Sequence, residues 1–204
     1  MKKTALTNAT IYTMDGKINV IEKGNILCGG KNILAVGEAV DLPPDVEVID
    51  MKGKTVVPGF IDAHTHLGIL EEVYRVEGDD LNEFTEPVTP ELRAIDAVNP
   101  YDLAFRDAVE GGVTTVMTGP GSSNVISGTS LVMKTAGTSL QEMVLVPQAG
   151  LKVAFGENPK RTYGAQKKMP VTRMGIAALL RKAFTDAQVY ARKKEKAQKE
   201  GEVL

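Results

Sequence analysis

The sequence has little of several features that define whole classes of protein. It contains one cysteine, Cys28, so it cannot form an internal disulfide, which suits a reducing cytoplasm. Its formal net charge is −2, which gives no electrostatic basis for binding nucleic acid or an anionic membrane. No apolar run approaches the roughly 20 residues of a membrane span, and polar residues interrupt the stretch that a signal peptide would need after Lys3. We therefore expect a soluble cytoplasmic protein that acts on a small molecule.

The first 57 residues alternate short apolar, β-branched pieces with turn-forming pairs. The predicted strands are Ala5–Met14, Ile18–Ile21, Ile26–Cys28, Ile33–Val36 and Val46–Ile49. The pairs between them, such as Asp15-Gly16 and Gly29-Gly30, stand at hairpin spacing. This pattern predicts a small antiparallel, sandwich-type β domain over residues 1–57. Alone it is too small to bury much core, so we expect it to need a partner surface.

Residues 58–204 have a different pattern, in which strands and helices alternate. The predicted elements are a strand that ends near His66, a helix over Tyr101–Glu110, strands at Val113–Met117, Ser130–Lys134 and Leu151–Phe155, and a long helix over Arg173–Lys199 capped by Thr172. This order is typical of a parallel α/β architecture. About 150 residues remain for it, against roughly 250 in a closed eight-stranded barrel, and the last helix shows no stop signal. We therefore expect that the chain is incomplete.

The two histidines of the sequence, His64 and His66, follow the apolar strand that begins this second part. Residues i and i+2 of a strand point to the same face, so both imidazoles are expected to converge at its carboxyl end, where α/β barrels place their active sites. Imidazole nitrogen binds Zn²⁺ and similar ions at neutral pH. Asp62, one step deeper on the same face, could support a ligand from behind.

Several segments resemble the amidohydrolase superfamily, and its imidazolonepropionase-related branch in particular. They are Gly53–Gly68 with the β domain before it, and the motifs at residues 86–90, 93–96, 112–116 and 156–161. The resemblance implies the N-terminal part of a TIM-type (β/α)8 barrel over residues 58–204, with the first strand giving the His-x-His pair. It also implies a bridging carbamylated lysine or glutamate from the fourth strand, two further histidines, and a general-base aspartate. The last three would lie beyond residue 204.

The bridging ligand has two candidates in this sequence, Lys152 and Glu157. If Leu151–Phe155 is the strand, Lys152 lies at its amino end, away from the metal, and Glu157 lies just past its carboxyl end. The position of Glu157 past the carboxyl end favours it as the bridging ligand. Lys160 and Arg161 are candidate ligands for a substrate carboxylate, because the arginine fork matches that geometry.

The function expected from these features is metal-dependent hydrolysis. One or two divalent ions, zinc being the expected metal, would activate a water that attacks a non-peptide C–N bond of a cyclic amide or amidine. The full-length protein is expected to be a homo-oligomer, and this chain alone to be poorly active. Two alternatives stay open: a deaminase of the same fold, and a non-catalytic relative that uses the fold for assembly.

Overall fold

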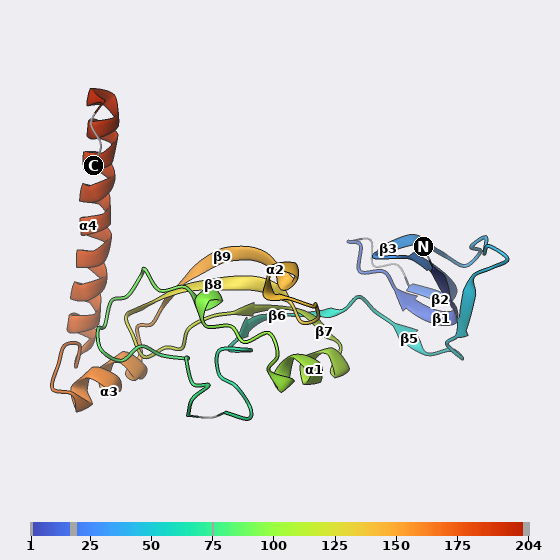
Figure 1. Cartoon of the computed structure of the whole chain (residues 1–204), viewed down its shortest axis with the longest axis horizontal. Coiled ribbons are helices and arrows are strands. Elements are labelled where there is room, and N and C mark those ends of the chain that lie inside the picture. Colours follow the sequence, from blue (N-terminus) through green and yellow to red (C-terminus); the bar gives the residue numbers. More distant parts are fainter. Residues whose placement is uncertain (1, 17–19, 75, 202–204) are drawn as a thin grey trace. The chain divides into compact units, whose positions relative to one another are not determined.

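The computed structural model describes residues 2–16, 20–74 and 76–201 (Figure 1). The chain divides into two compact units, Met1–Gly59 and Phe60–Leu204, close to the expected boundary at residues 57 and 58. Within the described residues, no helix combines the length and apolar character needed to cross a membrane.

The first unit is one mixed five-stranded sheet, and the prediction of an antiparallel domain is wrong in part. Its strands are β1 (Lys3–Tyr12), β2 (Val20–Gly29), β3 (Asn32–Gly37), β4 (Glu47–Asp50) and β5 (Thr55–Val56). The order is β3-β2-β1-β4, and β5 also pairs with β1. β1, β2 and β3 form antiparallel pairs, whereas β4 and β5 lie parallel to β1. The predicted strand Ile18–Ile21 falls partly on residues 17–19, outside the described residues.

The parallel pairs arise from the connection after β3. A two-residue turn joins β2 to β3, but the segment with Pro43 and Pro44 carries the chain back across the sheet to β1. Such a return gives parallel strands, which a two-residue turn cannot join. A small core of Ala9, Ile11 and Ile26 lies on one face of the sheet.

The second unit is built on a four-stranded sheet in the order β6-β7-β8-β9. The strands are β6 (Phe60–Thr65), β7 (Val113–Thr118), β8 (Ile126–Lys134) and β9 (Val144–Val153). The helices are the 3-10 turn η1 (Ala94–Asp96), α1 (Leu103–Glu110), α2 (Leu140–Met143), α3 (Glu157–Ala165) and α4 (Arg173–Glu200). β6 and β7 are parallel, but β8 is antiparallel to both β7 and β9.

The antiparallel strand β8 corrects the prediction of an all-parallel barrel half. Only a loop joins β7 to β8, and a parallel pair requires a crossover long enough to hold a helix. The sheet is open, with β6 and β9 as its edges. The described chain is therefore a mixed α/β structure without a closed barrel.

Strand β9 begins earlier than predicted and ends earlier as well. Its first residue is Val144, and Lys152 is its last but one. Pro147 and Gly150 make the first half of the strand look like a loop in the sequence. A proline is tolerated here because β9 is an edge strand, and an edge leaves one row of N–H groups unpaired.

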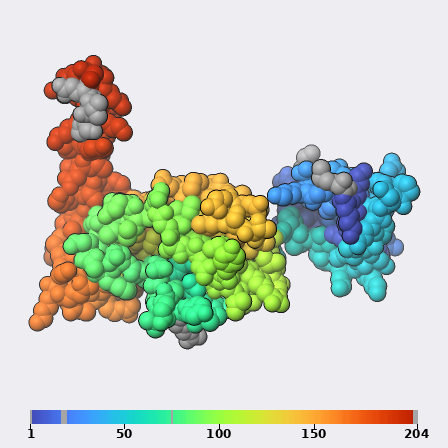
Figure 2. Space-filling view, in the orientation of Figure 1, coloured from blue at the N-terminus to red at the C-terminus, as the bar shows by residue number. Residues whose placement is uncertain are grey.

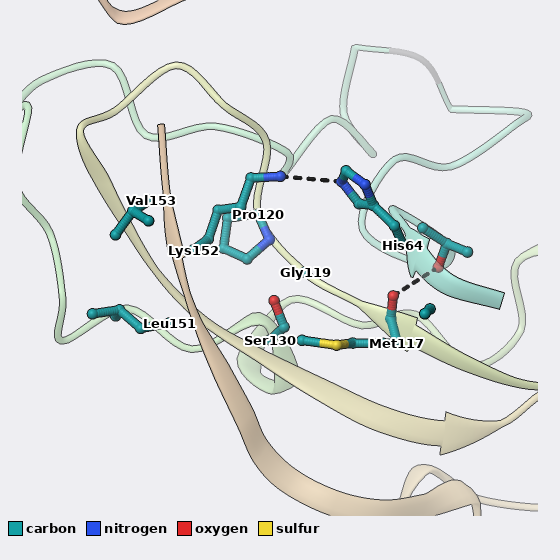
Figure 3. Close-up of a pocket in the computed structure, with 10 residues that line it drawn as sticks. His64, Met117, Gly119, Pro120, Ser130, Leu151, Lys152 and Val153 are labelled. Atoms are coloured by element: carbon teal, nitrogen blue, oxygen red, sulfur yellow. Dashed lines mark hydrogen bonds between the residues drawn. The ribbon is translucent and has the colours of Figure 1, made fainter. Parts of the chain in front are cut away.

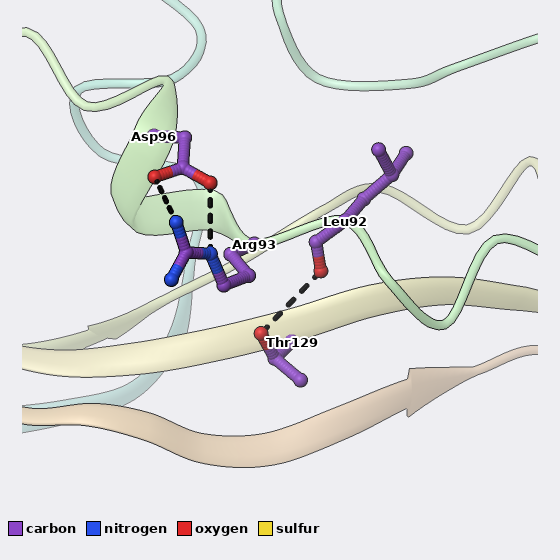
Figure 4. Close-up of polar contacts among 4 residues, drawn as sticks. All are labelled: Leu92, Arg93, Asp96 and Thr129. Carbon is purple, nitrogen blue, oxygen red and sulfur yellow. Dashed lines mark hydrogen bonds and ion pairs between the residues drawn. The ribbon is translucent and has the colours of Figure 1, made fainter. Parts of the chain in front are cut away.

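The long segment between β6 and α1 spreads over one face of the second unit (Figure 2, teal to green). Part of it runs beside β8, with bridges Val88–Ile126 and Arg93–Thr129. The Leu92 carbonyl oxygen accepts from the Thr129 backbone N–H at 2.8 Å and from the Thr129 hydroxyl at 3.4 Å. Figure 4 shows this contact and the two-pronged ion pair of Arg93 with Asp96. The main core lies under this segment, around Ile69, Phe105, Leu131 and Met133.

Helix α3 is absent from the prediction, and α4 agrees with it at its start. The Thr172 hydroxyl caps α4 by accepting from the Gly175 N–H at 3.0 Å. Gly201, in the left-handed conformation at φ 71°, ends the helix. The expectation that this helix lacks a stop signal is therefore wrong, because a left-handed glycine is the commonest helix terminator.

Candidate metal centre

The two histidines lie together at the carboxyl end of β6. Their ring centroids are 5.7 Å apart and the ring planes are nearly perpendicular, at 80°. A register shift in the β6–β7 ladder lies between Asp62 and Thr65. Within it, the Asp62 carboxylate accepts a hydrogen bond from the His64 backbone N–H at 3.0 Å. Asp62 thus holds the main chain of the His-x-His segment.

A backbone carbonyl group fixes the tautomer of His66. The His66 Nδ1 atom lies 2.7 Å from the Gly119 carbonyl oxygen, in the loop after β7. Because a carbonyl oxygen can only accept, Nδ1 carries the proton, and in the neutral imidazole Nε2 then keeps its lone pair. Metal-binding histidines are commonly oriented in this way, by a second-nitrogen hydrogen bond to a carbonyl or carboxylate.

The side chain of Lys152 reaches His64 from the other edge of the sheet. Its Nζ lies 3.1 Å from His64 Nε2, although the two residues are 88 positions apart in the sequence (Figure 3). Both line a pocket of about 320 Å³. The other lining residues are Ala63, Thr65, Met117, Gly119, Pro120, Ser130, Leu151 and Val153. The pocket is therefore mostly apolar, with nitrogen atoms from Lys152 and His64 at its polar end.

The position of Lys152 corrects the argument that favoured Glu157. The sequence pattern predicted a strand over Leu151–Phe155, with Lys152 at its amino end. The strand in fact runs from Val144 to Val153, so Lys152 lies at its carboxyl end, beside the histidines. Glu157 lies in the first turn of α3, where both its carboxylate oxygens accept from Lys160 Nζ, at 2.9 and 3.0 Å. This ion pair holds the pKa of Glu157 below its usual value.

The structure does not bring the other predicted ligands to the histidine pair. Glu157, Lys160 and Arg161 are absent from the residues that line the pocket. Lys160 is paired with Glu157, and Arg161 Nη2 donates to Asn158 Oδ1 at 3.5 Å on the same helix. Their roles in metal and substrate binding stay predictions.

The groups that converge fit part of a divalent metal site. His66 Nε2 and His64 Nε2 are imidazole nitrogens at one end of a strand, and an amine faces the second of them. Among the described residues, no group of three or more His, Cys, Asp and Glu side chains is close enough to hold a metal ion. Among the described residues that line this pocket, Lys152 is the one besides His64 whose side chain carries a nitrogen atom. Pro147 and Gly150 precede this lysine in β9. Both residue types are unfavourable within strands, so the sequence pattern did not indicate a strand over that part.

Similar proteins point to one superfamily. No family model matches the sequence. Amidohydrolase tasK of Hapsidospora irregularis is 33% identical over 168 residues, which is 77% of this chain and 17% of that protein. A 5-methylthioadenosine/S-adenosylhomocysteine deaminase of Bacillus cereus (strain 03BB102) is 38% identical over 122 residues, 55% of this chain and 27% of the deaminase.

A solved structure matches almost the whole chain. An amidohydrolase from Thermotoga maritima MSB8 superposes with a TM-score of 0.91 at 43% sequence identity, covering 98% of this chain and 51% of that protein. The chain therefore spans about half the length of that relative, and about a quarter or less of the two curated ones. These similarities identify the chain as a relative of the amidohydrolase superfamily that corresponds to an N-terminal portion of such proteins.

Proposed function

We propose that this chain supplies the histidine pair and the bridging lysine of a metal-dependent amidohydrolase site. The observation that carries the proposal is the 3.1 Å approach of Lys152 Nζ to His64 Nε2. An ammonium group cannot bind a metal. A charged lysine beside a metal-binding imidazole therefore needs to lose its proton or be modified covalently before it can act as a ligand.

Carbamylation is the change that fits this lysine. The neutral amine of Lys152 attacks carbon dioxide, a C–N bond forms, and one proton is released to water. The product is an anionic carbamate, whose two oxygens resemble those of a glutamate. Carboxylate-type oxygens and imidazole nitrogens are both good zinc ligands. The side chain of Lys152 would then offer its oxygens on the same side as His64 and His66.

The substrate class that we propose is a cyclic amide or amidine. Zinc bound here would supply an activated water at neutral pH and polarise the bond to be broken. The residues of this chain would orient the substrate: Met117, Pro120 and Leu151 offer apolar surface to a flat ring. No carboxylate is among the residues that line the described pocket, so the general base would come from elsewhere. The narrower assignment, an imidazolonepropionase-like ring hydrolase, rests on the motifs at residues 86–90, 93–96, 112–116 and 156–161.

Metal content with and without bicarbonate tests the proposal. Purified chain is incubated with zinc, desalted, and its zinc per chain measured by elemental analysis. We expect zinc retention to rise with bicarbonate in the wild type and in Glu157→Gln. The double variant His64→Ala, His66→Ala should retain none, and Lys152→Ala should lose the bicarbonate effect. Lys160→Ala, which removes another lysine of the same region, is the matched control and should behave as wild type.

Two results would contradict this assignment. Unchanged zinc in the double histidine variant would remove the histidines from the site. A bicarbonate effect that survives in Lys152→Ala while zinc is lost in Glu157→Gln would restore Glu157 as the bridging ligand.

Deamination is the second candidate, because the matching Bacillus proteins bear the name of deaminases at 38–40% identity. The two reactions differ in product: a deaminase releases ammonia from an amino-substituted ring, whereas a ring hydrolase opens the ring and releases none. Zinc-loaded protein is assayed for ammonia with 5-methylthioadenosine and for ring opening with a cyclic ureide. Ammonia release that requires His64 and His66 would favour the deaminase.

A further inference from the structure

The carbonyl group that orients His66 belongs to the peptide unit between Gly119 and Pro120. The Gly119 N–H is tied to the Thr65 carbonyl oxygen at 3.2 Å, but the direction of the Gly119 carbonyl depends on the next torsion, ψ. Glycine has no side chain to limit that torsion. The peptide unit that contains this carbonyl ends at Pro120, which has no N–H to anchor it. Besides the close packing of Gly119 on Ser130 and the limit that a proline places on the ψ angle before it, hydrogen bonds further along the loop restrain this carbonyl.

Two hydrogen bonds from a distant segment hold the rest of this loop. The Gly121 N–H donates to the Leu81 carbonyl oxygen at 2.8 Å. The Ser123 N–H donates to the side-chain Oδ1 of Asn82 at 3.1 Å. The contact is also close: a Cβ atom on Gly121, which is buried, would lie 2.3 Å from Asn82 Oδ1. The Asn82 amide thus packs directly on the loop backbone just past the peptide that faces His66.

The segment that carries Asn82 starts at His66 itself. The Ile69 and Leu70 N–H groups donate to the His66 carbonyl oxygen, at 3.2 and 3.1 Å. The chain later returns, and the Asp80 N–H donates to the Ile69 carbonyl oxygen at 3.0 Å. The described residues 67–74 and 76–82 therefore belong to a segment that starts at His66 and returns beside the loop that orients its ring.

We propose that Asn82 is a positioning residue for His66, acting through the loop Gly119–Ser123. Its Oδ1 fixes the loop, the loop fixes the direction of the Gly119 carbonyl, and that carbonyl selects the tautomer of His66 with Nε2 free. The consequence for metal affinity rests on the proposed function, whereas the consequence for the tautomer does not.

Two substitutions separate the hydrogen bond from the space that the side chain fills. Asn82→Asp keeps an acceptor oxygen at the same position along the side chain. Asn82→Leu has a similar shape but cannot accept. The proposal predicts that Asn82→Asp behaves as wild type and that Asn82→Leu does not.

The first measurement is the imidazole NMR spectrum of ¹⁵N-histidine-labelled full chain, at a concentration where it is monomeric. The wild type and Asn82→Asp should show His66 as the Nδ1–H tautomer. In Asn82→Leu we expect a mixture of tautomers at His66, while His64 in the same spectrum is unchanged. A wild-type His66 that is protonated on Nε2 would overturn the proposal, as would an Asn82→Leu spectrum identical to that of the wild type.

The second measurement is zinc affinity by competition with a chelating dye. We expect Asn82→Leu to bind zinc about tenfold more weakly, the lower end of the effect of removing a group that orients a metal ligand, and Asn82→Asp to bind as the wild type does. Equal loss in both variants would overturn the proposal. If the tautomer changes as predicted but the wild type binds no zinc, the proposed function fails and the positioning role stands.

Hydrogen exchange covers the case in which Asn82→Leu does not fold. In the wild type and in Asn82→Asp, the amides of Gly121 and Ser123 should both be protected. Rapid exchange of the Ser123 amide in these folded proteins would show that the Asn82 contact does not hold the loop, and would overturn the proposal.

Discussion

Tyr163 is completely buried, and its hydroxyl oxygen lies 2.6 Å from both the Glu86 carbonyl oxygen and Asn124 Oδ1. The Asn124 amide in turn donates to the Thr89 hydroxyl at 3.0 Å, and that hydroxyl donates to the Ile126 carbonyl oxygen at 3.1 Å. Tyr163 lies in α3, and its partners lie in the loop segments next to Ile126, the first residue of β8. A single tyrosine hydroxyl thus connects helix α3 to the strand that pairs with β9 beside Lys152.

Removing this hydroxyl should lower stability measurably. Tyr163→Phe removes the one hydroxyl proton that faces two buried acceptors, the Glu86 carbonyl oxygen and Asn124 Oδ1, so we expect a loss of about 1–3 kcal/mol in the free energy of unfolding. Urea unfolding followed by circular dichroism measures it. Tyr101→Phe is the control, because Tyr101 is 81% exposed, and its substitution should change little.

The same hydroxyl gives a dependence on pH. Burial raises the pKa of Tyr163 to about 12 from an ordinary value of 10.0. The folded protein therefore holds this proton more tightly than the unfolded chain. The resulting stability is fully present below pH 10.0 and declines as pH rises towards about 12. Stability should fall less steeply across this window in Tyr163→Phe than in the wild type, and equal slopes would contradict the assignment.

At the scale of elements, the bulge at Gly128 decides how the long segment before α1 docks on β8. Gly128 has φ +111°, a conformation that L side chains rarely adopt, and a Cβ there would lie 2.4 Å from the Leu92 carbonyl oxygen. The ladder between β8 and β9 shifts register at this point. Glycine is therefore required both by the torsion and by the close approach of the segment that carries Leu92.

Gly128→Ala should loosen this docking. We expect a loss of at least about 1–3 kcal/mol from the strained torsion, with faster hydrogen exchange of the Thr129 amide, which donates to Leu92. Gly111→Ala is the matched control, since Gly111 has φ −76° and its nearest Cβ neighbour would be at 3.4 Å. If the two variants are equally stable, close approach at Gly128 is not what holds the segment.

At the scale of the whole molecule, the sheet of the second unit has two open edges. Along edge strand β6, Phe60 is 58% and Ile61 is 72% exposed. Unpaired N–H and C=O groups beside apolar side chains favour pairing with another chain.

We therefore expect this chain to self-associate as its concentration rises. Ile61→Lys, which places a charge on the edge strand, should reduce association with little change in melting temperature. Light scattering coupled to size exclusion measures it. Val76→Lys alters a side chain that is 84% exposed but lies outside the sheet, and should leave association unchanged. Equal effects of both lysines would show that general charge, not the edge, controls association.

The elements that could be predicted from the sequence are those that depend on a few neighbouring residues. The strand before His64 and His66, the helix capped by Thr172 and the glycine-terminated α1 all depend on contacts within one or two turns of chain. The placement of both histidines at the end of one strand could also be predicted locally, because residues i and i+2 of a strand point to the same face.

Which strands pair, and which side chains meet, depends on the tertiary structure. Lys152 faces His64 because β9 begins at Val144 and tolerates Pro147 at a sheet edge, a tolerance that depends on which strands are its neighbours. The antiparallel entry of β8 and the parallel pairing of β4 with β1 depend likewise on where the chain returns. Such pairings join residues dozens of positions apart, and their free energy comes from long-range packing and hydrogen bonds that no short window of sequence contains.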